Sequence, residues 1–386
     1  MSQAASIAIA ISAIAVVGIG LSLSIPLLSL ELESRGISST FIGLNTAVAG
    51  VATIVLAPFV PQMVRHIGAR TLLIAGTIIT AICLLSFKAV PSFILWFPLR
   101  FIFGGALCVL FVVSEFWINA VAPPHRRGLI MGIYATALSI GAALGPAMLS
   151  ILGSTGWTPY VAGALVLLAG ALPILFARGM APAIAENSHH GVFTFLRRSP
   201  TALLAALVFG AMETSVLSFL PVYGMRLGLP ETNASLLLTV AVLGNVAFQI
   251  PLGLVSDKVD RRLLLCGCAL LGAIGCFCLT LVDVNTYSFL IMVFLATGVV
   301  GSLYTVGLAH LGARFHGADL ASANAAFVMM YSVGLIIGPP LTGAGMDAYN
   351  PYGFAFVIGG GLAAYALLVA VRLVIRRSDT PLDQAN

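Results

Sequence analysis

The chain contains Gly141-Ala142-Ala143-Leu144-Gly145-Pro146 in one long apolar run and Gly334-Leu335-Ile336-Ile337-Gly338-Pro339 in another. Glycines at positions i and i+4 share a helix face and leave a groove in which a second helix can approach closely. The following prolines, Pro146 and Pro339, each remove a backbone donor and kink the helix. The second copy follows the first after 193 residues (145 to 338), half of the 386-residue chain. The repeat predicts a duplicated bundle whose halves meet at grooved, kinked helices.

The composition indicates a protein that crosses a membrane many times. Hydrophobic residues make up 60% of the chain and charged residues only 8%, whereas soluble domains carry about 25% charged residues. The mean hydropathy of +1.09 leaves no room for a sizeable soluble domain. The basic residues lie in short loops between apolar runs, which fits charge asymmetry across a membrane better than a nucleic-acid-binding face.

Cofactor and metal chemistry find little support in the sequence. The six cysteines all lie within apolar runs without nearby histidines, so we interpret them as packing residues. The sequence contains no phosphate-binding P-loop, no H-E-x-x-H pair and no G-x-S-x-G elbow. We therefore expect neither an enzyme nor a bound cofactor or metal, and energy from an ion gradient rather than from nucleotide hydrolysis.

Twelve apolar stretches are long enough to cross a bilayer, which takes about 20 residues per helix. They predict an all-α fold with twelve transmembrane helices in two pseudo-symmetric six-helix bundles. The expected division is a first bundle at 1–178, a cytoplasmic linker at 179–199, a second bundle at 200–378 and a tail at 379–386. The stretches are 6–30, 39–64, 70–90, 93–120, 128–152, 158–177, 200–225, 234–256, 261–281, 286–313, 319–345 and 352–375.

The loop charges predict the orientation. Alternate loops place 14 of the 18 Lys and Arg residues on the side of both termini, and only Arg35, Lys88 and Arg226 on the other side. The positive-inside rule therefore puts both termini in the cytoplasm.

Several motifs resemble the major facilitator superfamily, whose transporters are built from repeated halves. Gly253-Leu-Val-Ser-Asp257-Lys-Val-Asp260-Arg261-Arg262 is similar to the family's loop signature G-x-L-a-D-r-x-G-r-k, with Asp260 in place of the second glycine. Arg100-Phe-Ile-Phe-Gly104 is similar to the R-x-x-x-G of the fourth helix, and Gly141–Pro146 to the fifth-helix signature of antiporters. The segment Ser114–Asn119 resembles the bacterial YcaD-like branch. The resemblance implies a secondary transporter in the bacterial cytoplasmic membrane.

The first half of the chain departs further from the family pattern. The first-half loop carries Arg65 where the family has aspartate and Pro61 where it has glycine. A proton role attached to that aspartate cannot be transferred to Arg65. Leu149 and Ser150 replace the glycine pair that usually ends the fifth-helix signature, which weakens the antiporter implication.

Two charged residues inside the apolar stretches are candidates for proton coupling. Arg100 lies well inside 93–120, where an arginine costs about 3 kcal/mol or more to insert. It could serve an anion or proton-coupling site, or bond structurally to backbone carbonyls. Glu213 lies in the middle of 200–225, where a carboxyl could take up and release a proton as a cavity changes sides. It could equally lie in a wet vestibule or remain paired with a hydroxyl.

The resemblance also implies ion pairs that close the cytoplasmic side. Glu115, at the cytoplasmic end of the fourth helix, would pair with Arg70 as part of a gate, or the pair could be purely structural. Asp257, beside Arg261, would meet the start of the fifth helix near Arg127, where the helix dipole favours a carboxylate. By pseudo-symmetry, Arg65 and Asp319 would form the same bridge with the signs reversed.

Weaker polar candidates could line a cavity, or could simply be tolerated, because interhelical hydrogen bonds in membranes average only about 0.6 kcal/mol. They are Asn45, Tyr134, Asn245, Gln249 and Tyr304.

Together these observations predict a transporter that works by alternating access, with proton-coupled export of a small, partly apolar molecule. Import or facilitated diffusion of a metabolite is the alternative within transport. A receptor or scaffold that kept the fold without transport is the alternative from another class. We expect a monomer whose partners are a small molecule, protons and the lipid bilayer.

Overall fold

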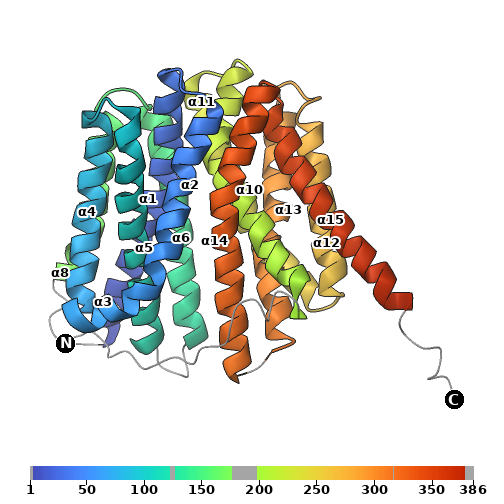
Figure 1. Cartoon of the computed structure of the whole chain (residues 1–386), viewed down its shortest axis with the longest axis horizontal. Helices are drawn as coiled ribbons and strands as arrows, with labels where there is room; N and C mark the ends of the chain where they lie inside the picture. Colours follow the sequence, from blue (N-terminus) through green and yellow to red (C-terminus); the bar gives the residue numbers. More distant parts are fainter. Residues whose placement is uncertain (1–2, 122–126, 176–197, 316, 379–386) are drawn as a thin grey trace. The chain divides into compact units, whose positions relative to one another are not determined.

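The computed structural model describes residues 3–121, 127–175, 198–315 and 317–378, and nearly all of them are helical (Figure 1). In chain order the elements are α1 (Gln3–Ser34), α2 (Ser39–Leu56), η1 (Ala57–Phe59), α3 (Val60–Ile67), α4 (Ala69–Ala89), η2 (Phe93–Leu95), α5 (Trp96–Val121), α6 (Arg127–Leu152), α7 (Thr158–Gly170), α8 (Leu172–Leu175), α10 (Pro200–Arg226), α11 (Glu231–Ser256), α12 (Arg261–Cys278), α13 (Tyr287–Gly312), α14 (Gly317–Ala348) and α15 (Gly353–Ser378).

The predicted all-α membrane fold is confirmed. Within the described residues, ten helical segments are long and apolar enough to cross a membrane, and two shorter apolar helices, Thr136–Leu152 and Thr158–Gly170, match the remaining predicted stretches. One predicted stretch, 39–64, is interrupted by the 3-10 turn η1 between α2 and α3. Pro58 and Pro61 lie there, and each lacks the N–H that a continuous α-helix needs.

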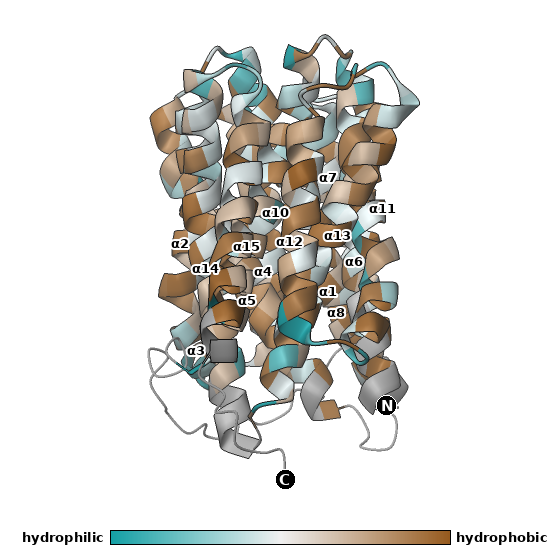
Figure 2. Ribbon diagram, turned by 90° about the vertical axis from the view of Figure 1, so that its right-hand side faces the viewer, coloured by the Kyte–Doolittle hydropathy of each residue, from teal (hydrophilic) through white to brown (hydrophobic). Residues whose placement is uncertain are grey.

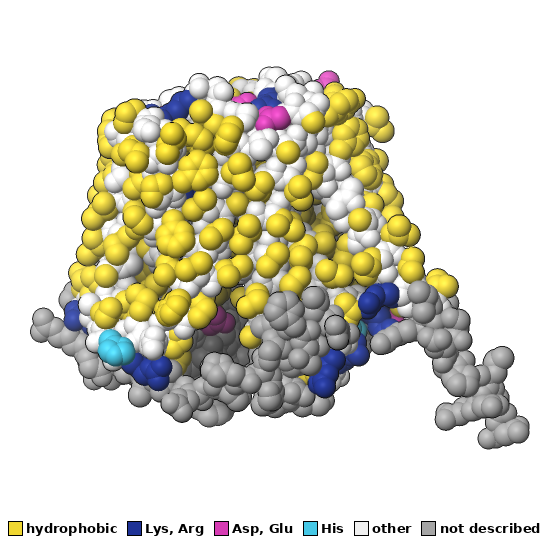
Figure 3. Space-filling model, viewed as in Figure 1, with side chains coloured by type: hydrophobic (Ala, Val, Ile, Leu, Met, Phe, Trp, Pro, Cys, Tyr) yellow, Lys and Arg dark blue, Asp and Glu magenta, His cyan; other side chains and the backbone are white. Residues whose placement is uncertain are grey.

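The outer faces of the helices suit a hydrocarbon solvent. Large apolar side chains are exposed along them; Ile250 is 74% exposed and Leu367 66%. Hydrophobic residues occupy the middle of the helices and hydrophilic ones gather near the loops (Figure 2). On the face drawn in Figure 3, hydrophobic side chains cover the helix middles and charged side chains lie toward their ends. This pattern follows from a bilayer whose core is about 30 Å thick.

The helices form two compact units. Unit 1 comprises residues 1–187 and 216–239, and unit 2 comprises residues 188–215 and 240–386. The boundary between the units thus crosses α10 and α11, whereas the sequence places it in the linker 179–199. The division into bundles at 1–178 and 200–378 stays a prediction.

The glycine motif makes the same helix crossing in both units. In unit 1, a Cβ added to Gly141 of α6 would lie 2.6 Å from the carbonyl oxygen of Ala15 in α1. In unit 2, a Cβ added to Gly334 of α14 would meet the carbonyl oxygen of Leu207 in α10. Each partner pair repeats after nearly the same interval (15 to 207, 141 to 334), so the internal repeat of the sequence is also a repeat of packing.

The glycine faces pack against different partners from the ones that the motif suggests. The pattern predicts that the two halves meet at these faces, but each face is filled by a helix of its own unit, α1 for Gly141 and Gly145 and α10 for Gly334 and Gly338. The physical reason is that a backbone-to-backbone approach leaves no room for a further helix. Pro146 and Pro339 lie inside α6 and α14, one residue after these contacts.

Candidate functional site

The strongest candidate site lies in unit 2, at Glu213 of α10. The hydroxyl of Tyr331 in α14 donates a hydrogen bond of 2.6 Å to the Glu213 carboxylate. Close packing brings the two together, because Gly210, one turn before Glu213, has no side chain to hold α14 away. A Cβ at Gly210 would lie 3.0 Å from the Tyr331 ring. Glu213 is half-buried, and it is well inside a predicted span as expected.

Aromatic rings surround this carboxyl. Tyr304 of α13 contacts Tyr331 with the ring centroids 5.7 Å apart, and Phe209 lies 5.5 Å from Tyr304 and 6.0 Å from Tyr331. Phe327 meets Tyr304 edge-on at 5.2 Å. We call Phe209, Tyr304, Phe327 and Tyr331 the aromatic cluster. A carboxyl with a tyrosine hydroxyl in an apolar wall can exchange a proton and contact an apolar molecule.

Only Tyr304 of the aromatic cluster is among the sequence candidates. Tyr331 could have been found, because it lies three residues before Gly334 and so falls beside the face that approaches α10. Phe209 and Phe327 carry no such signal, since phenylalanines are common in any membrane helix.

Asn245 and Gln249 of α11 lie together, as their spacing predicts. Gln249 donates to the Asn245 side-chain oxygen at 3.1 Å. The same oxygen lies against Gly301 of α13, where an added Cβ would collide with it. Part of their hydrogen-bonding capacity is thus used between themselves, which also makes them a helix contact.

Three candidates lie in unit 1. Arg100 of α5 and Asn45 of α2 are each 1% exposed. The three guanidinium nitrogens of Arg100 and the amide nitrogen of Asn45 have no hydrogen-bond partner among the described residues. Tyr134 of α6 is 5% exposed and shares a 3.0 Å hydrogen bond with Ser114 of α5.

The cytoplasmic ion pairs implied by the family stay predictions, but the structure describes some of their members. Arg70 donates to the backbone carbonyls of Ile174 (3.3 Å) and Leu175 (2.6 Å) of α8, so its guanidinium is engaged there. Glu115 is exposed.

The loop signature of the second half has its own local arrangement. Asp257 pairs with Arg261, one turn away, at 3.2 Å. Asp260 caps α12 by accepting from the Arg262 N–H at 2.8 Å, with a φ of −60° that does not require the family's glycine. The matching position in the first half is Gly68, whose φ of +88° does favour glycine. Arg65 is exposed, and the side chains of Arg127 and Asp319 lie outside the described part of the structure.

Charged residues at the other end of unit 1 form pairs that sequence reasoning missed. Glu31 binds both Arg35 (2.8 Å) and Lys88 (3.1 Å). Glu33 binds Arg226 through two hydrogen bonds of 2.8 and 2.9 Å. The i,i+4 spacing of Glu31 and Arg35 is readable from the sequence. No local spacing could reveal the Glu33 pair, because its partners are 193 residues apart.

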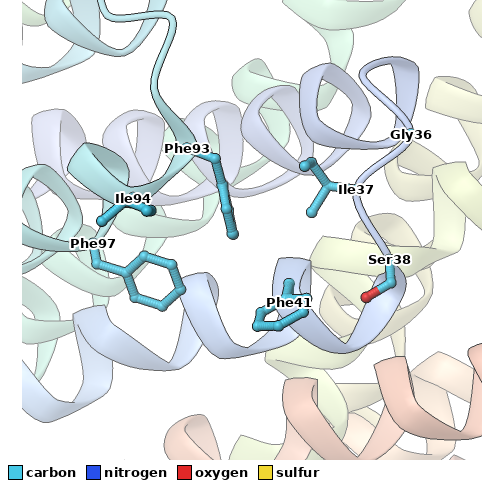
Figure 4. A pocket seen from close by; sticks show the side chains of 7 residues that line it. All are labelled: Gly36, Ile37, Ser38, Phe41, Phe93, Ile94 and Phe97. Atoms are coloured by element: carbon cyan, nitrogen blue, oxygen red, sulfur yellow. The ribbon is translucent and has the colours of Figure 1, made fainter.

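Unit 1 also has an apolar hollow of about 550 Å³. The side chains of Phe41, Phe93 and Phe97 line it together with Gly36, Ile37, Ser38 and Ile94 (Figure 4). It lies between the α1–α2 turn and η2, and its lining offers apolar contact with a single hydroxyl. Its lining carries no titratable group.

Comparisons with known proteins agree with the motifs. The family model of the Major Facilitator Superfamily matches residues 10–235 and 226–386. The chain is 26% identical over 324 residues to the uncharacterized MFS-type transporter YfkF of Bacillus subtilis, covering 82% of this chain and 83% of that protein. It is 24% identical over 322 residues to the transporter YcaD of Salmonella typhi, covering 82% of both.

Solved structures show the same fold. The nucleoside transporter NupG matches with a TM-score of 0.77 at 16% identity, covering 97% of this chain and 99% of that one. A D-xylose-proton symporter matches with a TM-score of 0.71 at 17% identity, covering 95% and 97%.

Proposed function

Because the chain belongs to the Major Facilitator Superfamily, we propose that it exports a small, partly apolar molecule across the bacterial cytoplasmic membrane in exchange for protons. Its relatives are transporters and not enzymes. Alternating access would carry the substrate, and both termini would be cytoplasmic, in keeping with the unequal distribution of Lys and Arg.

The hydrogen bond between Tyr331 and Glu213 is the observation that supports proton coupling best. Intramembrane carboxyls are costly and are typically found where protons or substrates pass. The Tyr331 hydroxyl can remain bonded to the carboxyl while water or substrate reaches its other oxygen. Glu213 would thus be the group that gains and loses the proton.

The aromatic cluster supports a partly apolar substrate. Rings such as Tyr304 and Phe209 offer flat apolar surface with few polar atoms, and ligand sites are mostly built in this way. Export, rather than import, is favoured by the resemblance of Gly141–Pro146 to the antiporter signature. The first test is a comparison of metabolite and toxin contents in cells with and without the protein.

The mechanistic test uses purified protein in vesicles with an imposed pH gradient and the substrate found in that comparison. Substrate added to the native protein should dissipate the gradient, whereas Glu213→Gln should bind substrate without moving protons. Asp283→Asn is the matched control, because Asp283 is exposed in a loop and bonds only to its near neighbours. Unchanged proton movement in Glu213→Gln would refute the assignment. Opposite membrane orientations of the vesicles separate export from import.

A further inference from the structure

Helices α2 and α5 pack side by side in a fixed register. A Cβ at Gly104 of α5 would lie 2.7 Å from the Cα of Ala49 in α2. One turn further on, the Cys108 thiol reaches the Thr53 carbonyl at 3.9 Å, across the same 55-residue interval. One turn in the other direction, the same interval pairs Arg100 with Asn45. Because residues four apart share a helix face, these two side chains lie at one level of the contact.

Both residues bring unsatisfied donors to this level. The guanidinium nitrogens of Arg100 and the amide nitrogen of Asn45 are buried without an acceptor among the described residues. The neighbouring hydroxyl of Thr46 is already engaged, because it donates to the Ile42 carbonyl and accepts from Ser218. The group that completes this arrangement must therefore supply acceptor atoms and, for the arginine, negative charge.

Among the described residues, the half-buried arginines of unit 1 each have hydrogen-bond acceptors, unlike Arg100. Arg35 has a carboxylate and a carbonyl, Arg70 has two carbonyls, and Arg226 has a carboxylate and a hydroxyl. Arg100 is more buried than these three, at 1% exposure. A buried cation without partners is strongly unfavourable, so a structural role alone does not account for Arg100.

We propose that Arg100 and Asn45 form a carboxylate-binding subsite, which makes the transported molecule a small monocarboxylate with an apolar remainder. The planar guanidinium matches a carboxylate with two parallel hydrogen bonds, and the Asn45 amide can add a third. A single guanidinium suits one negative charge. Entry requires movement of the surrounding helices, because Arg100 is enclosed. The substrate assignment rests on the proposed transport function; the binding subsite does not.

The test is calorimetric titration of the purified full chain without a proton gradient. The probes are butyrate, benzoate and indole-3-acetate, with benzamide as the neutral analogue of benzoate and inorganic phosphate as a competing anion source. We expect at least one carboxylate to bind. Its affinity should fall roughly 10-fold or more in Arg100→Gln, the usual scale for a charge-assisted hydrogen bond. The control Arg372→Gln, which removes an exposed arginine of α15, should bind as the native chain does.

A second variant remains informative if Arg100→Gln does not fold. Asn45→Asp places a carboxylate opposite Arg100, so it should preserve or raise the melting temperature and abolish binding of the carboxylate probes. The proposal is overturned if none of the three carboxylates binds, if benzamide binds as well as benzoate, if only phosphate binds, or if Asn45→Asp leaves carboxylate binding unchanged. Carboxylate binding that persists in Glu213→Gln separates the two proposals, because this subsite then stands whatever the coupling measurement gives.

Discussion

Gly145→Ala tests the packing on which the fold depends. The new Cβ would lie 2.5 Å from the backbone nitrogen of Leu23 and 2.6 Å from the carbonyl carbon of Ser22. Ordinary contacts at a Cβ begin at about 3.4 Å, and backbone atoms cannot rotate away. Helix α1 would have to move by roughly 1 Å relative to α6, a displacement that a packed core resists. The Ser22 hydroxyl, which donates to the Gly141 carbonyl at 3.2 Å, would be displaced too.

The size of the effect follows from three terms. Overpacking of this kind costs about 1–3 kcal/mol, and loss of the hydrogen bond costs about 1 kcal/mol. Replacement of a helical glycine by alanine returns about 1 kcal/mol. The net loss should be about 1–3 kcal/mol. Gly360→Ala in α15 is the matched control, because nothing lies within 4 Å of its added Cβ, so only the favourable propensity term applies.

The assay is the apparent melting temperature of the detergent-solubilised chain, measured by loss of the monodisperse peak after heating. Gly145→Ala should melt several degrees below the native chain, and Gly360→Ala at or above it. Gly338→Ala should fall with Gly145→Ala, since its Cβ would lie 2.5 Å from the Cα of Ala211. Equal melting temperatures for Gly145→Ala and Gly360→Ala would refute the packing argument.

Three further outcomes are expected. Tyr331→Phe removes only the hydroxyl that bonds Glu213, so it should cost about 1 kcal/mol of stability and slow proton-coupled transport about 10-fold; transport at the native rate would contradict this. Arg226→Gln breaks the half-buried pair with Glu33 and should destabilise by about 1–2 kcal/mol at low salt, with a smaller loss in about 1 M NaCl, read from melting temperatures at both salt levels. Gly68→Ala should cost about 1–3 kcal/mol because its φ is +88°; an unchanged melting temperature would show that the turn can relax.

Much of the fold could be predicted from the sequence. Length and hydropathy alone locate the helices, because a membrane helix must satisfy its backbone internally and present apolar side chains along its length. The glycine motif also gave the place of a close helix contact. It did not give the partner, because a groove records that a helix approaches and not which one, and α1 fills the groove at Gly141.

The candidate site was predicted only in part. Glu213 could be found because a carboxyl inside an apolar stretch is rare, whereas its partner Tyr331 carries only the weaker signal of lying three residues before Gly334. The partner of Arg70 could not be predicted for a different reason, because a long side chain can reach several acceptors. Arg70 donates to the carbonyls of Ile174 and Leu175, which lie 104 and 105 residues away in the chain, and no local spacing indicates such partners.

The shared crossing of α1 with α6 and of α10 with α14 bears on how the sequences of the two repeats can diverge. Where two helix backbones touch, a methyl group added to either helix requires a shift of the whole opposite helix. Single substitutions at Gly141 or Gly334 are therefore expected to be destabilising. Loops and lipid-facing positions are under no such restriction and can drift apart freely. The internal repeat should therefore persist longest at these glycine contacts, where the residues have no side chains.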